Sequence, residues 1–79
     1  MKIRDYNDDQ GLPKEHQGTI VTKKEGFGFI SVDGSGKDIF CSANSVLGGL
    51  WDAVQENDRV KFKIGYSYMG VVACDILVA

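Results

Sequence analysis

The chain has 79 residues, and its nine Lys and Arg residues against eleven Asp and Glu residues give a net charge of −2. This length allows one small domain with a modest core. The 43% apolar content, with ten glycines and one proline, is typical of a turn-rich β protein rather than of a disordered chain. No apolar run approaches the roughly 18 residues of a membrane span, and residues 1–10 lack the apolar stretch of a secretory signal. We therefore expect a cytoplasmic protein without a membrane partner.

The cysteines and the charge exclude some classes of site. Cys41 and Cys74 are too few for a disulfide scaffold, and neither lies in a C-x-x-C pair or at metal-ligand spacing from the single histidine, His16. We expect both to be small buried side chains, and we expect no metal site. A phosphate-binding domain is usually basic. The negative net charge therefore counts against nucleic-acid binding, which would have to depend on stacking and on local charge.

The first part of the chain, residues 1–17, is polar, mixed in charge and without periodicity, and it contains the only proline. We predict a flexible N-terminal arm over this range and a single domain over residues 18–79. Within that domain, short apolar runs alternate with glycine-rich and acidic turns, as in an all-β barrel or sandwich.

The strands are predicted in chain order. Residues 19–23 and 27–32 form the first two, joined by a tight hairpin connection. Residues 33–36 (Asp-Gly-Ser-Gly) are the strongest turn signal, so a third strand over 37–42 completes a three-stranded meander. A longer link over 43–56 follows, with one short 3₁₀ turn expected within 44–50.

After a turn at Asn57-Asp58, residues 59–65 are predicted as the fourth strand, 66–70 as a loop and 71–78 as the last strand. Five strands in so short a chain indicate a closed barrel, because an open two-sheet sandwich would need more strands. The fold predicted from the strand pattern is therefore an all-β, five-stranded closed barrel.

Two phenylalanines mark the second strand. Successive side chains of a strand point to opposite faces, so Phe27 and Phe29 share one face while Gly28 and Ile30 share the other. Rings that point outward are costly to expose, and unpaired nucleobases are flat partners of suitable shape. The alternative is that both rings belong to the core. We favour the outward orientation, because the alternating apolar residues Ile30, Val32, Ile39 and Cys41 can fill the inward face.

These motifs resemble the cold-shock domain, a family that binds single-stranded RNA and DNA. The resemblance implies an all-β, five-stranded antiparallel barrel of the oligonucleotide/oligosaccharide-binding (OB) type. Residues 25–30 (EGFGFI) match the family's K-G-F-G-F-I motif, and residues 39–43 (IFCSA) match its V-F-V-H-F motif in part. The RNA recognition motif has a similar signature, but there the second motif precedes the first and helices intervene. The resemblance covers residues 18–79.

The resemblance implies a set of nucleic-acid-binding residues. Phe27, Phe29 and Phe40 would be stacking rings. Trp51 would be an exposed loop aromatic, although a lone Trp after Gly-Gly is otherwise more often a partly buried hydrophobic plug. Tyr66 and Tyr68 either extend this surface or are ordinary half-buried loop aromatics. The full expected set is Phe27, Phe29, Phe40, Trp51, Lys23, Lys24, Lys37, Ser42, Tyr66 and Tyr68.

The chain departs from the family pattern at several of these positions. Thr22-Lys23-Lys24 replaces the ring-bearing K-W-F-N segment, Ser42 and Ala43 replace a histidine and a phenylalanine, and Glu25 replaces a lysine that would face phosphate. Each base stacked on an aromatic ring is worth about 1–3 kcal/mol. The missing rings and cation are therefore expected to weaken binding by orders of magnitude.

Two functions remain in competition. The first is a cytoplasmic module that binds single-stranded RNA or DNA and, as the resemblance implies, acts as an RNA chaperone or a regulator of transcripts. The second is a degenerate barrel that associates with a protein partner or with its own second copy, as the acidic charge and missing rings suggest. Arg59, Lys61 and Lys63 share one strand face, which is typical of a solvated side. His16 lacks a nucleophile partner, so we expect no enzyme activity, no cofactor and no small-molecule substrate.

Overall fold

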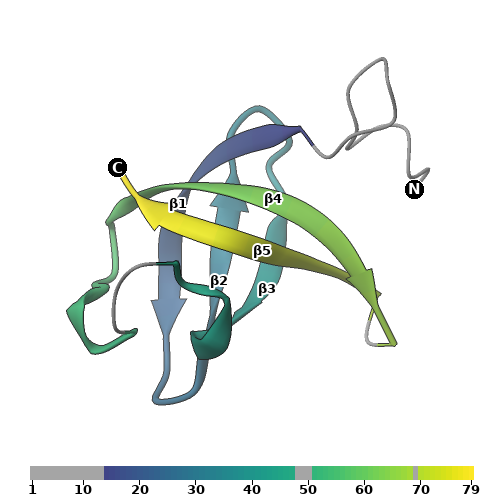
Figure 1. Ribbon diagram of the computed structural model, residues 1–79. Coiled ribbons are helices and arrows are strands. Elements are labelled where there is room, and N and C mark those ends of the chain that lie inside the picture. Colours follow the sequence, from purple (N-terminus) through teal and green to yellow (C-terminus); the bar gives the residue numbers. More distant parts are fainter. Residues whose placement is uncertain (1–13, 48–50, 69) are drawn as a thin grey trace.

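A computed structural model describes residues 14–47, 51–68 and 70–79, and within these ranges the chain forms a closed barrel with the strand order β1-β2-β3-β5-β4 (Figure 1). The predicted five-stranded OB-type barrel is confirmed. The strands are β1 (Glu15–Lys23), β2 (Phe27–Val32), β3 (Asp38–Ser42), β4 (Arg59–Ser67) and β5 (Gly70–Val78), with 3₁₀ turns η2 (Ala43–Ser45) and η3 (Trp51–Ala53) between β3 and β4.

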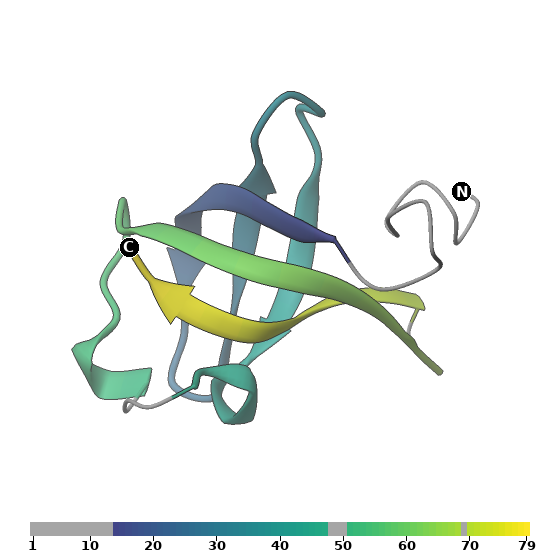
Figure 2. The same cartoon turned by 45° about the horizontal axis from the view of Figure 1, so that its top comes forward.

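The closing pair of the barrel corrects one part of the prediction. The strands β3 and β5 run parallel, with Phe40 opposite Val72 and Cys41 opposite Ala73, whereas the other described pairs are antiparallel. The reason is topological. The link through η2 and η3 carries the chain across one end of the barrel, so the β4–β5 hairpin enters with β5 aligned in the direction of β3. Figure 2 shows β4 and β5 crossing the β2–β3 hairpin, with both 3₁₀ turns at one end.

The first strand begins earlier than expected. Residues 15–17 were predicted to belong to the arm, but they pair with β4, with Glu15 opposite Lys63 and His16 opposite Phe62. The imidazole of His16 stacks on the Phe62 ring, with 6.1 Å between ring centroids. The polar composition of this segment hid the strand, because its stability comes from a ladder with a distant strand. The arm predicted over residues 1–13 lies outside the described residues.

The core is built from side chains that alternate along β1, β2 and β4, together with Cys41 of β3 and with Ala73 and Ile76 of β5, which are three residues apart across a register shift. The boundaries of β2 match the prediction, and those of β3, β4 and β5 differ from it by one or two residues at an end. Burial of the Cys41 thiol raises its pKa to about 11, so this cysteine behaves as a small apolar side chain. Cys74 is only half-buried. The buried residues are Ile20, Ile30, Cys41, Trp51, Val54, Val60, Phe62, Ile64, Ala73 and Ile76.

The predicted turn over residues 33–36 is fastened to the barrel wall by an ion pair. Gly34 adopts a φ of +82°, a conformation that favours glycine. The guanidinium of Arg59 on β4 donates from Nη1 to Asp33 Oδ1 at 2.9 Å and from Nη2 to the second carboxylate oxygen, and Nη1 also donates to Thr19 Oγ1 at 2.9 Å. The hydrogen bonds from Arg59 lower the pKa of Asp33. The turn is thereby tied to both β1 and β4.

Gly28 is the position where β2 has no room for a side chain. A Cβ atom there would lie 2.4 Å from the carbonyl oxygen of Thr22 and 3.0 Å from Cη2 of Trp51. We therefore expect Gly28→Ala to lower the free energy of unfolding by about 1–3 kcal/mol, because backbone and ring must both shift. Urea denaturation followed by Trp51 fluorescence measures the change.

Gly26→Ala is the matched control, because a Cβ atom at that position would meet nothing within 4 Å. We expect it to change stability by less than about 0.5 kcal/mol. Equal stability of the two variants would contradict the described packing of Trp51 against β2.

Candidate nucleic-acid interface

Three phenylalanine rings form a cluster on the outer surface of β2 and β3. The ring centroids of Phe27 and Phe40 lie 5.8 Å apart in a stacked arrangement, and Phe29 meets Phe27 at 6.3 Å and Phe40 at 6.0 Å, edge to face. Phe29 is directly opposite Phe40 in the strand register. We call Phe27, Phe29 and Phe40 the aromatic cluster. It brings together the three rings that the motifs singled out.

The orientation of this cluster confirms the predicted faces of β2. Gly28 and Ile30 are buried, while Phe27 keeps 39% of its surface exposed and Phe29 and Phe40 are partly exposed. The rings therefore cover one another's edges but leave apolar surface in contact with solvent. Offset and edge-to-face pairs are favourable arrangements for aromatic rings. The cluster is preorganised, and its exposed faces are available to a flat partner.

The expectation that Trp51 is exposed is wrong. Only 6% of its surface is accessible, and its indole Nε1 donates to the backbone oxygen of Lys24 at 2.7 Å. The ammonium of Lys23 lies 5.5 Å from the centre of the indole ring. Trp51 is therefore a buried hydrophobic plug, which is closer to the alternative interpretation of a lone Trp after Gly-Gly. The space above Gly28, which no sequence pattern near Trp51 reveals, allows this burial.

The expected lysines divide into two groups. Lys23 is engaged internally: its ammonium donates to the backbone oxygen of Asp52 at 3.3 Å, and its backbone N–H donates to Glu56 Oε2 at 3.1 Å. Lys24 and Lys37 are exposed. Lys24 precedes Phe27 in the tight hairpin, where its N–H donates to the Phe27 carbonyl at 2.8 Å. Lys37 precedes β3, and these two lysines border the aromatic cluster along the chain.

Ser42 and the two tyrosines are placed differently from one another. Ser42 is opposite Phe27 in the register, and its hydroxyl accepts from the N–H of Asn44 at 3.3 Å, so it caps η2 beside the cluster. Tyr66 and Tyr68 are both exposed, Tyr68 at 99%, near the turn of the β4–β5 hairpin. They are not half-buried loop aromatics. Tyr66 is opposite Val71, whose neighbour Val72 pairs with Phe40.

Over residues 14–47, 51–68 and 70–79, no three His, Cys, Asp or Glu side chains come together as a group that could hold a metal ion. No helix in this part of the chain is long and apolar enough to cross a membrane.

Comparison with known proteins identifies the family. The sequence profile of the 'Cold-shock' DNA-binding domain matches residues 16–79. A cold shock protein of Arthrobacter globiformis is 36% identical over 62 residues, which cover 76% of this chain and 92% of that protein. A probable cold shock protein A of Mycobacterium tuberculosis is 32% identical over 62 residues, with the same coverage of each chain.

A solved structure agrees with this assignment. The structure of Drosophila Unr CSD456 superposes with a TM-score of 0.70 at 28% identity, over 84% of this chain. The match spans 27% of that much longer chain. With the barrel, the cluster and the profile in agreement, the chain belongs to the cold-shock DNA-binding domain family.

Proposed function

We propose that this protein binds single-stranded RNA or DNA by stacking unpaired bases on Phe27, Phe29 and Phe40. The observation that carries the proposal is the aromatic cluster itself, in which three rings contact one another on an outer sheet face while Phe27 remains 39% exposed. Similarity to cold shock proteins supports it. Every nucleobase has a flat face, so this mode of binding tolerates many sequences.

The balance of forces in this interface favours stacking over charge. Of the three lysines expected near the cluster, Lys23 is engaged with Trp51 and Asp52, which leaves Lys24 and Lys37 for phosphate. The exposed carboxylate of Glu25 lies between Lys24 and the cluster along the chain and opposes phosphate. Each stacked base contributes about 1–3 kcal/mol. Most of the affinity therefore comes from the rings.

A protein that binds in this way keeps nucleic-acid strands unpaired without catalysing a reaction. Stacked bases cannot pair with another strand, so binding shifts the equilibrium of a folded transcript toward its open form. We propose that the protein acts on transcripts in the cytoplasm as an RNA chaperone or regulator.

Protein association is the second candidate, and one observation favours it. Val46 pairs with Ile76 at the barrel end, and the next residues, Leu47 and Leu77, keep 47% and 44% of their surfaces exposed. Apolar surface of this kind suits a partner or a second copy.

Sedimentation of the protein over a range of concentrations tests self-association, and a monomer throughout would contradict the homodimer. Trp51, being buried, contributes nothing to either surface.

Phe29→Ala distinguishes a stacking ring from a core residue. We expect it to weaken binding of a fluorescent single-stranded oligonucleotide by about 5- to 150-fold, which corresponds to 1–3 kcal/mol. Its unfolding free energy should fall by only about 1–2 kcal/mol, because the ring loses contacts with two neighbours but leaves no internal cavity.

Ile30→Ala is the matched control on the inward face of the same strand. Ile30 is fully buried, so we expect its truncation to cost about 2–5 kcal/mol of stability while the folded fraction binds normally. An equal loss of stability in both variants, with unchanged affinity for Phe29→Ala, would refute the stacking role.

The salt dependence of binding tests the small contribution of charge. Two phosphate contacts, at Lys24 and Lys37, predict a slope of log affinity against log salt of about −1.4 for a single strand. Glu25→Lys should tighten binding at low salt and steepen the slope to about −2.1, because it adds one phosphate contact. The same change at Glu15, on the strand beside β4, should leave both unchanged. A slope near zero would contradict the two phosphate contacts and leave stacking as the sole contribution to affinity.

A further inference from the structure

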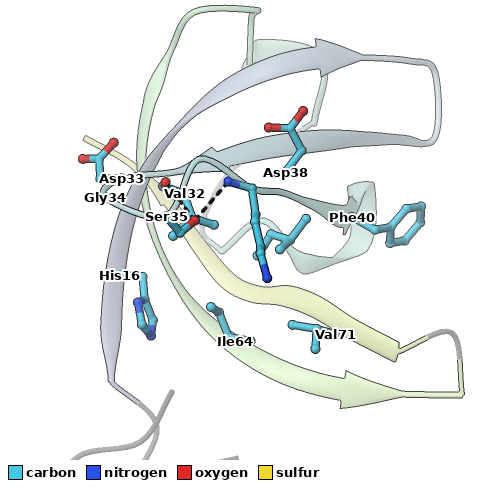
Figure 3. Close-up of a pocket in the computed structure, with 11 residues that line it drawn as sticks. His16, Val32, Asp33, Gly34, Ser35, Asp38, Phe40, Ile64 and Val71 are labelled. Atoms are coloured by element: carbon cyan, nitrogen blue, oxygen red, sulfur yellow. Dashed lines mark hydrogen bonds between the residues drawn. The ribbon is translucent and has the colours of Figure 1, made fainter. Parts of the chain in front are cut away.

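The barrel wall opens at one corner, between the beginnings of β3 and β5. In the described part of the chain, the ladder between these strands consists of Phe40–Val72 and Cys41–Ala73. The residues that precede these pairs border a hollow of about 500 Å³ (Figure 3). This size is within the range of about 300–1,000 Å³ found for small-molecule sites. The hollow has room for one nucleobase with its sugar.

The walls of the hollow differ in chemistry from its rim. Figure 3 shows Ile64 of β4 and Val71 of β5 along one side, with the His16 imidazole at one end. Val32 and Ile39 add further apolar surface from the adjacent strands. The rim is polar, with Ser35 and Lys37 from the connection between β2 and β3 and Asp38 from the first position of β3. Apolar walls with a few polar groups at the edge are the usual composition of a site for a flat heterocycle.

Phe40 connects this hollow to the aromatic cluster. It stacks on Phe27 at 5.8 Å and also lines the hollow, at the end opposite His16 (Figure 3). Lys37, one of the two lysines assigned to phosphate, lies on the same rim. A strand that crosses Phe27, Phe29 and Phe40 toward β5 therefore arrives at the opening. We propose that the hollow receives one unstacked nucleobase of the bound strand, an inference that rests on the proposed function.

The charges on the rim favour a base over a phosphate. The Asp33 carboxylate is held by Arg59, so its charge is compensated within the protein. The exposed Asp38 carboxylate opposes a phosphate at this position but accepts hydrogen bonds from the amino groups of bases. Lys37 provides a cation where the backbone of the strand would leave the hollow. The base enters, and its phosphate stays outside.

Methyl NMR of the wild-type protein tests the site directly. On addition of a single-stranded oligonucleotide of about eight nucleotides, within the site sizes of OB folds, the Ile64 and Val71 methyl signals should shift. They should also show intermolecular NOEs to base protons. Ring signals of the cluster report stacking in the same spectra. Adenosine monophosphate is the control for a free nucleotide: saturation of the methyl shifts at micromolar concentration would overturn the assignment to a strand.

Val71→Phe places a ring in the hollow and substitutes none of the three residues of the cluster. We expect it to weaken binding of the longer oligonucleotide about tenfold, which corresponds to the binding free energy of one base. Binding of a trinucleotide should not change, because three nucleotides occupy only the rings. Val78→Phe is the matched control, since it makes the same substitution at an exposed position of the same strand. Circular dichroism and thermal melting establish that both variants fold.

The outcomes separate this inference from the proposed function. Shifts and NOEs at both the cluster and the hollow, with a length-dependent loss in Val71→Phe, support the base site. Binding that perturbs only the cluster, with equal affinity in Val71→Phe, overturns the base site and leaves the proposed function intact. No saturable binding of any oligonucleotide at low salt overturns both. If Val71→Phe does not fold, the wild-type spectra alone decide.

Discussion

The contact between the Trp51 ring and the backbone of Gly28 determines how the two faces of β2 are used. Because Gly28 has no Cβ, the indole lies against the inner side of the strand and closes the core at that end of the barrel. The same strand presents Phe27 and Phe29 outward. A larger residue at position 28 would push the tryptophan away and shift the strand, so the arrangement of the outer rings depends on a contact made behind them.

Two cations of the described residues help to hold the fold together. Lys23 lies over Trp51 and Arg59 binds Asp33, so these side chains fix a loop and a turn. In the proposed binding mode, recognition depends on apolar ring faces, which do not attract a polyanion over a distance. Association should be slower than for a basic domain, because electrostatic steering is weak.

Much of the fold could be predicted from sequence because its signals are local. Alternation predicted β2 to the residue, and the Asp-Gly-Ser-Gly turn placed β3 beside it. The start of β1 was missed, because Glu15 and His16 are polar and gain their structure from distant β4. The aromatic cluster followed from one motif and its neighbour, whereas the burial of Trp51 depends on a vacancy above Gly28. The hollow is lined by His16, Ile64 and Val71, which lie on three different strands. No local sequence pattern predicts that these residues lie close together.

The short parallel seam between β3 and β5 has a kinetic consequence. The meander β1-β2-β3 joins neighbours in sequence, so its loops are short and inexpensive to close. The seam instead requires the two ends of a long segment, from β3 through η2, η3 and β4, to meet. Their pairing is stabilised only by a short ladder. Loop closure of this kind has the larger entropic cost. We therefore expect the seam to form last in folding and to open first in the native state, so that the amide protons bonded across it exchange before those of β2.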